Sequence, residues 1–232
     1  MKILFSPSEN KNFLYNQAPL SPGIENNYKK YLNFLQNAGT QELQKIWGYK
    51  KIEDVEKMRL ISSQSCVIPA IECYCGVAYE ALDFASLEAR EKEFILDSVL
   101  IFSNLFGVVS AGENLPFYKL KQGEGFGDFK TKDLYASLQD KIDLLLQEEC
   151  IIDLRAEFYQ KLYAIKSHYF SFEFLKNGKR ISHYAKYYRG IVLREIAKNH
   201  GLYKIEERLE NLGLKLLECK ETSSQTKFVF GL

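Results

Sequence analysis

The chain has 232 residues, of which 46% are hydrophobic and 26% charged, a balance typical of globular proteins. Its formal net charge of +1 argues against a protein that coats nucleic acid along its whole surface, although a local basic face is compatible with this balance. The length allows one large domain or two small ones, and no Pro/Gly/Ser-rich tract or block of like charge divides it. We therefore expect residues 1–232 to form a single domain.

Targeting and metal-binding signals are absent from the sequence. The apolar run after Met1 is too short for a secretory signal, and no segment approaches the ~20 apolar residues of a membrane helix. The 5 cysteines are odd in number and lack the paired short spacings of a zinc site. We expect a cytoplasmic protein with free thiols, no membrane partner, no metal and no cofactor.

The first half of the chain alternates short strands and helices. Residues 2–5 are predicted to form a short buried strand that Pro7 ends. Apolar and aromatic residues recur at helical spacing over 24–35, 41–47 and 52–60, and Thr40 is a plausible cap for the second of these helices. Further on, we expect an acidic helix over 88–96 and a buried strand over 99–102.

Residues 105–111 have an apolar-x-Gly-apolar-x-x-Ala pattern. A tight turn at Gly107 between two short helices would leave backbone N–H groups free to hold a DNA phosphate, assisted by Lys119 and Lys121. The same pattern also fits a strand–turn connection in a core.

The second half is predicted to complete a mixed sheet. An edge strand is expected over 115–121, one amphipathic helix over 133–147 and a buried strand over 150–154. Asn177-Gly178 lies between two strand-like runs and indicates a hairpin, and a last pair of strands is expected over 214–218 and 227–230. This order predicts a mixed α/β (α+β) fold in which helices flank a mixed sheet.

Cations accumulate between residues 176 and 204. Lys186, Arg189 and Arg194 fall near one side of a predicted helix, next to Tyr184, Tyr187 and Tyr188. Fixed cations beside aromatic rings suit phosphate contacts and base stacking, or the binding of a small anionic molecule. The alternative is a merely solvated helix, or one that the acidic helix over 88–97 neutralises.

Polar residues also follow the first strand and the strand over 150–154. Ser8, Glu9 and Lys11 follow the former, and Asp153 and Arg155 end the latter. Together with His183 they would make one polar site if the fold brings them together. A Ser8–His183–Asp153 relay lacks the strained Gly-x-Ser-x-Gly turn. Ordinary strand-to-loop transitions, and a histidine bonded to backbone, explain the same residues.

Several blocks, in order along the whole chain, resemble the YaaA family of bacterial peroxide-stress proteins. They are Pro7-Ser8-Glu9-x-Lys11, Gly76-x-x-Tyr79-x-x-Leu82, Asn104-Leu105-Phe106-Gly107 with Pro116-Phe117-Tyr118-Lys119-Leu120, Asp153-Leu154-Arg155, and Ser182-His183-Tyr184-Ala185-Lys186-x-x-Arg189-Gly190-x-x-x-Arg194. Each block is short, and their shared order carries the resemblance.

The resemblance implies a single-domain fold of unusual topology and a role in surviving hydrogen peroxide by limiting free iron and oxidative DNA damage. It also implies binding of double-stranded DNA through a basic cleft and a helix-hairpin-helix-like element. Mapped onto this chain, the cleft draws on Lys186, Arg189 and Arg194, and the element falls at 105–111. The rival hypothesis is an enzyme that acts on a nucleotide-like or other anionic molecule, although no catalytic motif of a known type supports it.

This chain departs from the family pattern in places that matter for DNA. Val109-Ser110-Ala111-Gly112-Glu113 stands where the family usually has Leu-Arg-Pro-x-Asp. Lys119 stands in place of an arginine, which keeps the charge and loses the planar two-pronged grip on phosphate. The usual arginine after the last strand is replaced by Gly231-Leu232.

Overall fold

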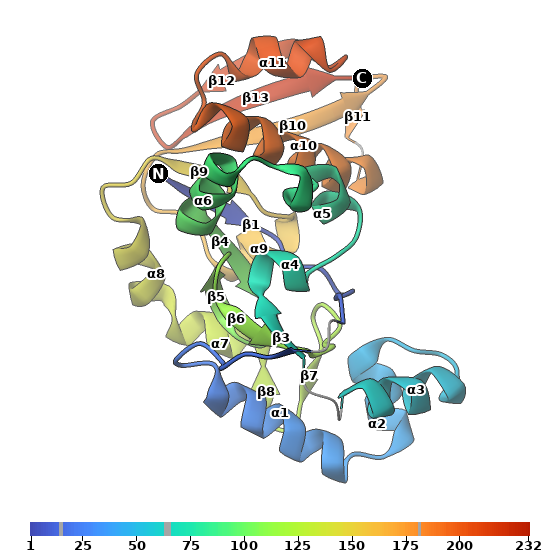
Figure 1. Cartoon of the computed structure of the whole chain (residues 1–232). Coiled ribbons are helices and arrows are strands. Elements are labelled where there is room, and N and C mark those ends of the chain that lie inside the picture. The colour runs from blue at the N-terminus through green and yellow to red at the C-terminus, as the bar shows by residue number, and fades with distance from the viewer. Residues whose placement is uncertain (14–15, 63–65, 181) are drawn as a thin grey trace.

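A mixed β-sheet forms the centre of the computed structural model, which describes residues 1–13, 16–62, 66–180 and 182–232. The strands lie in the order β12-β13-β10-β9-β1-β4-β5, and β11 pairs with β10 (Figure 1). Their bounds are β1 Lys2–Phe5, β4 Val99–Ser103, β5 Gly107–Ser110, β9 Ile151–Leu154, β10 Tyr169–Lys176, β11 Lys179–Arg180, β12 Lys215–Glu221 and β13 Gln225–Gly231. Strands β13, β10, β9, β1 and β4 run parallel, whereas β12 and β5 are antiparallel to their neighbours.

The central strands are apolar on both faces, as strands buried in a parallel sheet must be. In β1, Ile3 and Phe5 point into one core and Leu4 into the other, because successive side chains alternate across a strand. The first core contains Val192 and Ile196, and it continues without a break into the outer helices. Continuous Val/Ile/Leu/Phe runs in the sequence therefore mark the innermost strands.

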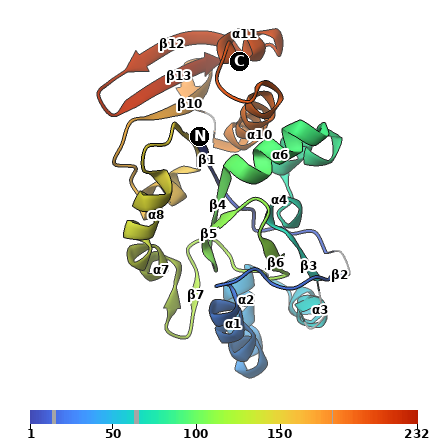
Figure 2. The ribbon, with the colours of Figure 1, turned by 60° about the vertical axis from the view of Figure 1, so that its left-hand side comes forward.

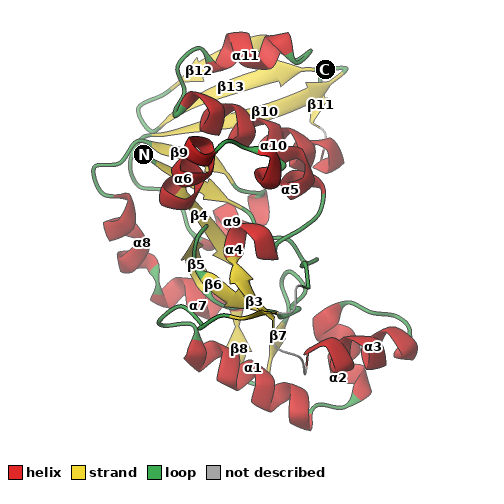
Figure 3. Cartoon of the chain, viewed as in Figure 1, coloured by secondary structure: helices red, strands yellow, loops and turns green. Residues whose placement is uncertain are grey.

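Helices cover both faces of this sheet (Figures 2 and 3). Those on one face are α5 Val77–Leu82, α6 Ala89–Ser98, α10 Ser182–Asn199 and α11 Ile205–Asn211, with a 3₁₀ turn over Phe84–Ser86. Those on the other are α7 Thr131–Ser137, α8 Gln139–Leu146 and α9 Glu157–Leu162. The predicted fold class, a mixed α/β arrangement with helices flanking a mixed sheet, is confirmed.

The remaining elements lie beyond the free edge of β5. They are α1 Glu25–Asn37, α2 Thr40–Trp47, α3 Ile52–Ser62, α4 Ala70–Cys73, a small sheet of β2 Asn16–Gln17, β3 Cys66–Pro69 and β6 Asn114–Pro116, and the hairpin β7 Gly125–Phe126 with β8 Phe129–Lys130. The Trp47 indole donates to the Tyr31 hydroxyl, and that hydroxyl donates to the Lys119 carbonyl oxygen at 2.8 Å. These buried bonds fix α1 and α2 to the segment around Lys119 that follows β6.

Residues 105–111 form a β-turn and strand β5, so the predicted pair of short helices is wrong. The Ser103 hydroxyl accepts the N–H groups of Leu105 and Phe106 and so closes the turn between β4 and β5. The β-branched Val108 and Val109 then favour a strand. The alternative, a strand–turn connection in the core, is what the structure shows.

Three other boundaries differ from the sequence prediction. The helix expected over 133–147 is two helices, because Leu138 at the junction has φ −101° and ψ 0°, outside the regular helix. The strand expected over 115–121 ends at Pro116. The chain after the Asn177-Gly178 hairpin becomes helical at Ser182. Of the helices in the described ranges, none combines the length and apolar character that crossing a bilayer requires.

Candidate functional site

A cleft of about 320 Å³ opens where the parallel strands β1 and β9 end. Ligands of open α/β sheets bind beyond the carboxyl ends of such strands, since loops and helix ends converge there. The walls come from the segment after β1, from the start of α5, from the segment after β9 and from the first half of α10. The side chains that can contact an anion there include Ser8, Gln122, Lys186 and Arg189.

Hydrogen bonds join the segments that form the walls. The Ser6 hydroxyl accepts the N–H of Ala156 at 2.7 Å, which links the chain after β1 to the chain after β9. The Tyr79 hydroxyl donates to the Ser6 carbonyl oxygen at 2.9 Å and so attaches α5 to the same segment. Glu9 accepts the N–H of Gln122 at 3.0 Å. The cleft is therefore built by backbone-anchored loops.

Asp153 and Arg155 lie beneath the cleft and bind each other. Both are buried, and the guanidinium donates to both carboxylate oxygens, at 2.8 and 3.0 Å. Its Nη1 group donates to the carbonyl oxygens of Tyr159 and Tyr163, and its Cζ lies 4.4 Å from the ring centre of Phe102. These bonds hold the pair in place and link it to α9. Of the polar residues predicted to converge, these two are buried and do not line the cleft.

Lys11 supports the cleft wall from behind. Its ammonium donates to the Ser8 and Glu9 carbonyl oxygens, at 2.9 and 3.3 Å, and lies 4.1 Å from the ring centre of Tyr118. Burial lowers the pKa of Lys11 to about 8. Lys11 thus folds the Ser8–Glu9 segment toward the aromatic core.

The first half of α10 presents two cations to the cleft. Lys186 is exposed, and Arg189 is half-buried at the inner wall. Neither makes a hydrogen bond or an ion pair with any residue in the described ranges. Burial lowers the pKa of Arg189, and the carboxylate of Asp153 opposes that shift. The Arg189 guanidinium can therefore donate hydrogen bonds to an anion that enters the cleft and neutralise its charge.

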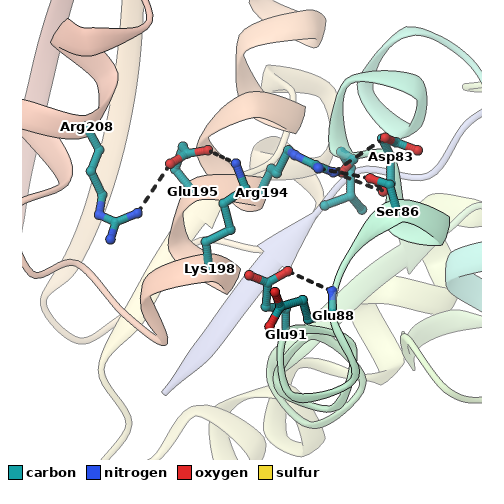
Figure 4. A network of polar contacts seen from close by, with 9 residues as sticks. Asp83, Ser86, Glu88, Glu91, Arg194, Glu195, Lys198 and Arg208 are labelled. Carbon is teal, nitrogen blue, oxygen red and sulfur yellow. Dashed lines mark hydrogen bonds and ion pairs between the residues drawn. The ribbon is translucent and has the colours of Figure 1, made fainter.

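The second half of α10 is different, because its cations have partners inside the molecule (Figure 4). Arg194 donates to the carbonyl oxygens of Leu82 and Asp83, at 2.7 and 3.0 Å, and to the Ser86 hydroxyl. Glu195 receives Lys198 at 2.8 Å and Arg208 at 3.5 Å. The prediction that Arg194 shares an open cationic face with Lys186 and Arg189 needs correction, since α5 occupies its guanidinium.

The other residues predicted to contact DNA are not placed at the cleft. Gly107 is buried, and an added Cβ there would come within 2.4 Å of Leu138 Cδ1. Lys119 is buried, with its ammonium 4.9 Å from the ring centre of Tyr49. Lys121 is exposed and lies 3.8 Å from Glu124. His183 falls in the first turn of α10, and its side chain is outside the described part of the structure.

The structure adds residues that sequence reasoning missed. Gln122 and Tyr159 line the cleft, and no local pattern marks either of them. Gly76 has φ 111°, a value that favours glycine, and it turns the chain into α5 beside Ser8. The Gly-x-x-Tyr block could have indicated this turn. Across the described ranges, no group of three or more His, Cys, Asp or Glu residues is arranged to hold a metal ion.

A larger hollow, of about 720 Å³, lies between α1 and the β7–β8 hairpin. Its charged lining residues are two lysines, Lys30 and Lys130, and two aspartates, Asp128 and Asp133. Its charges balance, and it is far from the strand ends. The cleft at β1 and β9 is therefore the better candidate for binding an anion.

Comparison with known proteins identifies the family. The family model described as peroxide stress protein YaaA matches residues 1–217. An uncharacterized protein of Campylobacter jejuni is 42% identical over 236 residues, covering 95% of this chain and 94% of that protein. A UPF0246 protein of Corynebacterium glutamicum is 30% identical over 213 residues, 85% of each chain, and one of Fusobacterium nucleatum is 26% identical over 261 residues, covering 99% and 98%. The chain thus belongs to the YaaA family of peroxide stress proteins.

Proposed function

We propose that this member of the peroxide-stress family binds double-stranded DNA through the cleft at the ends of β1 and β9, and thereby helps to limit free iron and oxidative DNA damage. The observation that carries the proposal is the pair Lys186 and Arg189, which line the cleft without a partner among the described residues. Keeping a half-buried guanidinium unpaired costs free energy that an incoming anion recovers. Arginine also matches the planar geometry of phosphate oxygens.

The helical hairpin formed by α2 and α3 supports a second contact with the DNA backbone. Gly48 between the helices has the left-handed values φ 72° and ψ 22°, and the exposed Lys45, Lys50 and Lys51 are close to it in sequence. Lys45 lies 3.9 Å from Glu124. The helix-hairpin-helix-like element that the family resemblance implies therefore fits here better than at 105–111. Acidic Glu53 and Asp54 in the first turn of α3 weaken the local positive charge, so we regard this contact as secondary.

The segment Lys121–Gln122 connects the hairpin to the cleft. The N–H of Lys121 donates to the Ile46 carbonyl oxygen at 2.7 Å, at the end of α2. The next residue, Gln122, bonds to Glu9 at the cleft. A DNA backbone that reaches Gly48 can thus pass Lys121 on its way to Lys186.

The test is duplex binding, measured by fluorescence anisotropy with a labelled 20-base-pair DNA. We expect Lys186→Glu/Arg189→Glu to weaken binding at least tenfold, since two phosphate contacts become repulsive. The control Lys132→Glu/Lys215→Glu makes the same change in net charge at exposed positions away from the cleft. Equal losses in both variants, or no duplex binding by the wild type at low salt, would refute the proposal. The same pair of variants, expressed in a deletion strain, tests survival of hydrogen peroxide.

An enzyme acting on a nucleotide-like anion is the second candidate, and the size of the cleft favours it. A volume of about 320 Å³ is near the lower end of small-molecule sites. Ser8, Glu9 and Arg189 would contact such a ligand, while Asp153 and Arg155 would only support the floor. A thermal-shift screen with nucleotides and phosphorylated metabolites separates the two functions. A compound that reproducibly raises the melting temperature of the wild type but not of Arg189→Met would favour the enzyme. If no compound raises it, DNA stays the proposed ligand.

A further inference from the structure

A second feature of α10, next to the cleft, is an exposed group of aromatic side chains. We call Val77, Tyr184, Tyr187 and Tyr188 the tyrosine patch; together they line a shallow hollow of about 370 Å³. Tyr184 is 59% exposed and Tyr187 42%. Large rings are seldom left this open to water in a pair unless they contact a partner.

Two rings of the patch, those of Tyr187 and Tyr188, pack against other rings. Tyr188 stacks on Phe174 of β10 with ring centres 5.1 Å apart, and Tyr187 meets Tyr188 edge-on at 5.2 Å. A ring that is already fixed loses little conformational entropy when another ring stacks on it. Tyr187 and Tyr188 are therefore preorganised, with their ring planes at 85° to each other.

Cations border the patch on two sides. The ammonium of Lys176 lies 5.7 Å from the ring centre of Tyr184. Val77 lines both the patch and the cleft that holds Lys186 and Arg189, so the two hollows are neighbours. Beyond Tyr187 lie the acidic side chains of Glu80 and Asp83 together with Arg194, whose guanidinium already has Asp83 and carbonyl oxygens as partners. The cleft, whose two cations have no partner among the described residues, therefore attracts a polyanion on the patch more strongly than the end of α5 does.

We propose that the tyrosine patch binds unpaired nucleotides of DNA, with bases stacked on Tyr184 and Tyr187 while the adjoining phosphates contact Lys186 and Arg189. Alternating rings and cations are the arrangement used to bind single strands, because every base has a π-face that can stack. Paired bases in a duplex present only their edges, so the patch adds affinity only where the strand is open. The inference rests on the proposed DNA binding and names its preferred substrate, a single-stranded or locally open DNA.

A second copy of this chain fits the patch less well. A two-fold contact would bring the patch against itself and place Lys176 and Lys186 of both copies close together. Four lining residues also offer much less than the ~800 Å² per partner of a stable interface.

The experiment compares a labelled 20-nucleotide oligothymidylate with a 20-base-pair duplex in anisotropy titrations. We expect Tyr184→Ala/Tyr187→Ala to weaken oligothymidylate binding at least tenfold and duplex binding less than threefold. Tyr184→Phe/Tyr187→Phe, which keeps the rings, should bind as the wild type does. Tyr203→Ala is the matched control, because Tyr203 is 73% exposed and also has a lysine, Lys204, 6.0 Å from its ring centre.

The outcomes separate this inference from the proposed function. If the wild type binds neither DNA, DNA binding itself is wrong and the inference fails with it. If duplex binding stands but the alanine variant holds oligothymidylate as tightly as the wild type, or the wild type binds no single strand, only the inference fails. Sedimentation that shows a dimer dissociated by Tyr184→Ala/Tyr187→Ala would assign the patch to a second copy and also overturn it.

Discussion

The two halves of α10 carry similar cations and use them differently. In the first half, Lys186 and Arg189 face the cleft without partners among the described residues. In the second, Arg194 binds α5 and Lys198 binds Glu195. Helix spacing alone places Lys186, Arg189 and Arg194 together, so the difference comes from what lies opposite.

The direction of α5 explains the contrast. Its last turn, at Leu82 and Asp83, ends beside Arg194, and the carbonyl oxygens at a helix C-terminus lack intrahelical donors and attract cations. Its first turn lies beside Lys186 and Arg189, and the first turn of a helix leaves N–H groups, not carbonyl oxygens, without intrahelical partners. The cations of α10 beside the start of α5 can therefore bind an external anion, whereas Arg194, beside the end of α5, binds the carbonyl oxygens of that helix.

The largest expected effect is at Gly190, between the two halves. A Cβ there would come within 2.1 Å of the Ala78 carbonyl oxygen and 2.9 Å of Ala81 Cβ, and a backbone atom cannot move aside easily. We expect Gly190→Ala to lower the free energy of unfolding by roughly 2–4 kcal/mol, although alanine is otherwise better in a helix by about 1 kcal/mol.

Urea unfolding followed by the fluorescence of the single, buried Trp47 measures this change. Gly112→Ala is the control, since a Cβ there meets Leu96 at an ordinary 3.6 Å. An unchanged midpoint for Gly190→Ala would show that α5 and α10 do not pack as closely as described.

The next effect compares the two arginines directly. Arg194→Met leaves the Leu82 and Asp83 carbonyl oxygens without a donor and should cost about 2 kcal/mol of unfolding free energy. Arg189→Met removes a half-buried charge that has no hydrogen-bond or ion-pair partner among the described residues, and should cost less than about 0.5 kcal/mol. Equal losses in the urea experiment would mean that both halves of α10 serve the fold.

The third effect is a pH dependence at Lys11, which is confined to alkaline pH. Its pKa is lowered to about 8, so above that pH the folded state releases a proton that the unfolded chain keeps until its ordinary pKa. The wild type should therefore gain stability relative to Lys11→Met as the pH rises from about 8 to 10, by roughly 1–3 kcal/mol. Urea unfolding of both proteins across this range measures the difference, and a constant difference would place the Lys11 ammonium in water.

The strands that form the centre of the sheet could be predicted from the sequence because their pattern is local. Apolar runs such as 99–102 have one physical solution, a strand covered on both faces. The Asn177-Gly178 turn is equally local. The prediction for residues 105–111 was wrong because a glycine between apolar residues is compatible with both a turn between helices and a turn between strands. Ser103, whose hydroxyl closes the turn between strands, lies outside the motif.

The site was predicted only in part, for the same reason. Ser8, Glu9, Lys186 and Arg189 do meet at one cleft, as the convergence of strand ends suggested. Asp153 and Arg155 are two residues apart, yet no sequence rule says that they satisfy each other. The hydrogen bonds of Arg194 depend on where α5 ends relative to α10, which is set by the tertiary structure and not by local sequence.

The salt dependence of duplex binding tests the central claim most directly. Each phosphate contact contributes a slope of roughly 0.9 to the plot of log K against log salt concentration. If Lys186 and Arg189 hold phosphates, Lys186→Met/Arg189→Met should reduce the magnitude of this slope by about 2, and Arg194→Met should leave it unchanged. A slope that is the same in the wild type and in Lys186→Met/Arg189→Met would contradict the account.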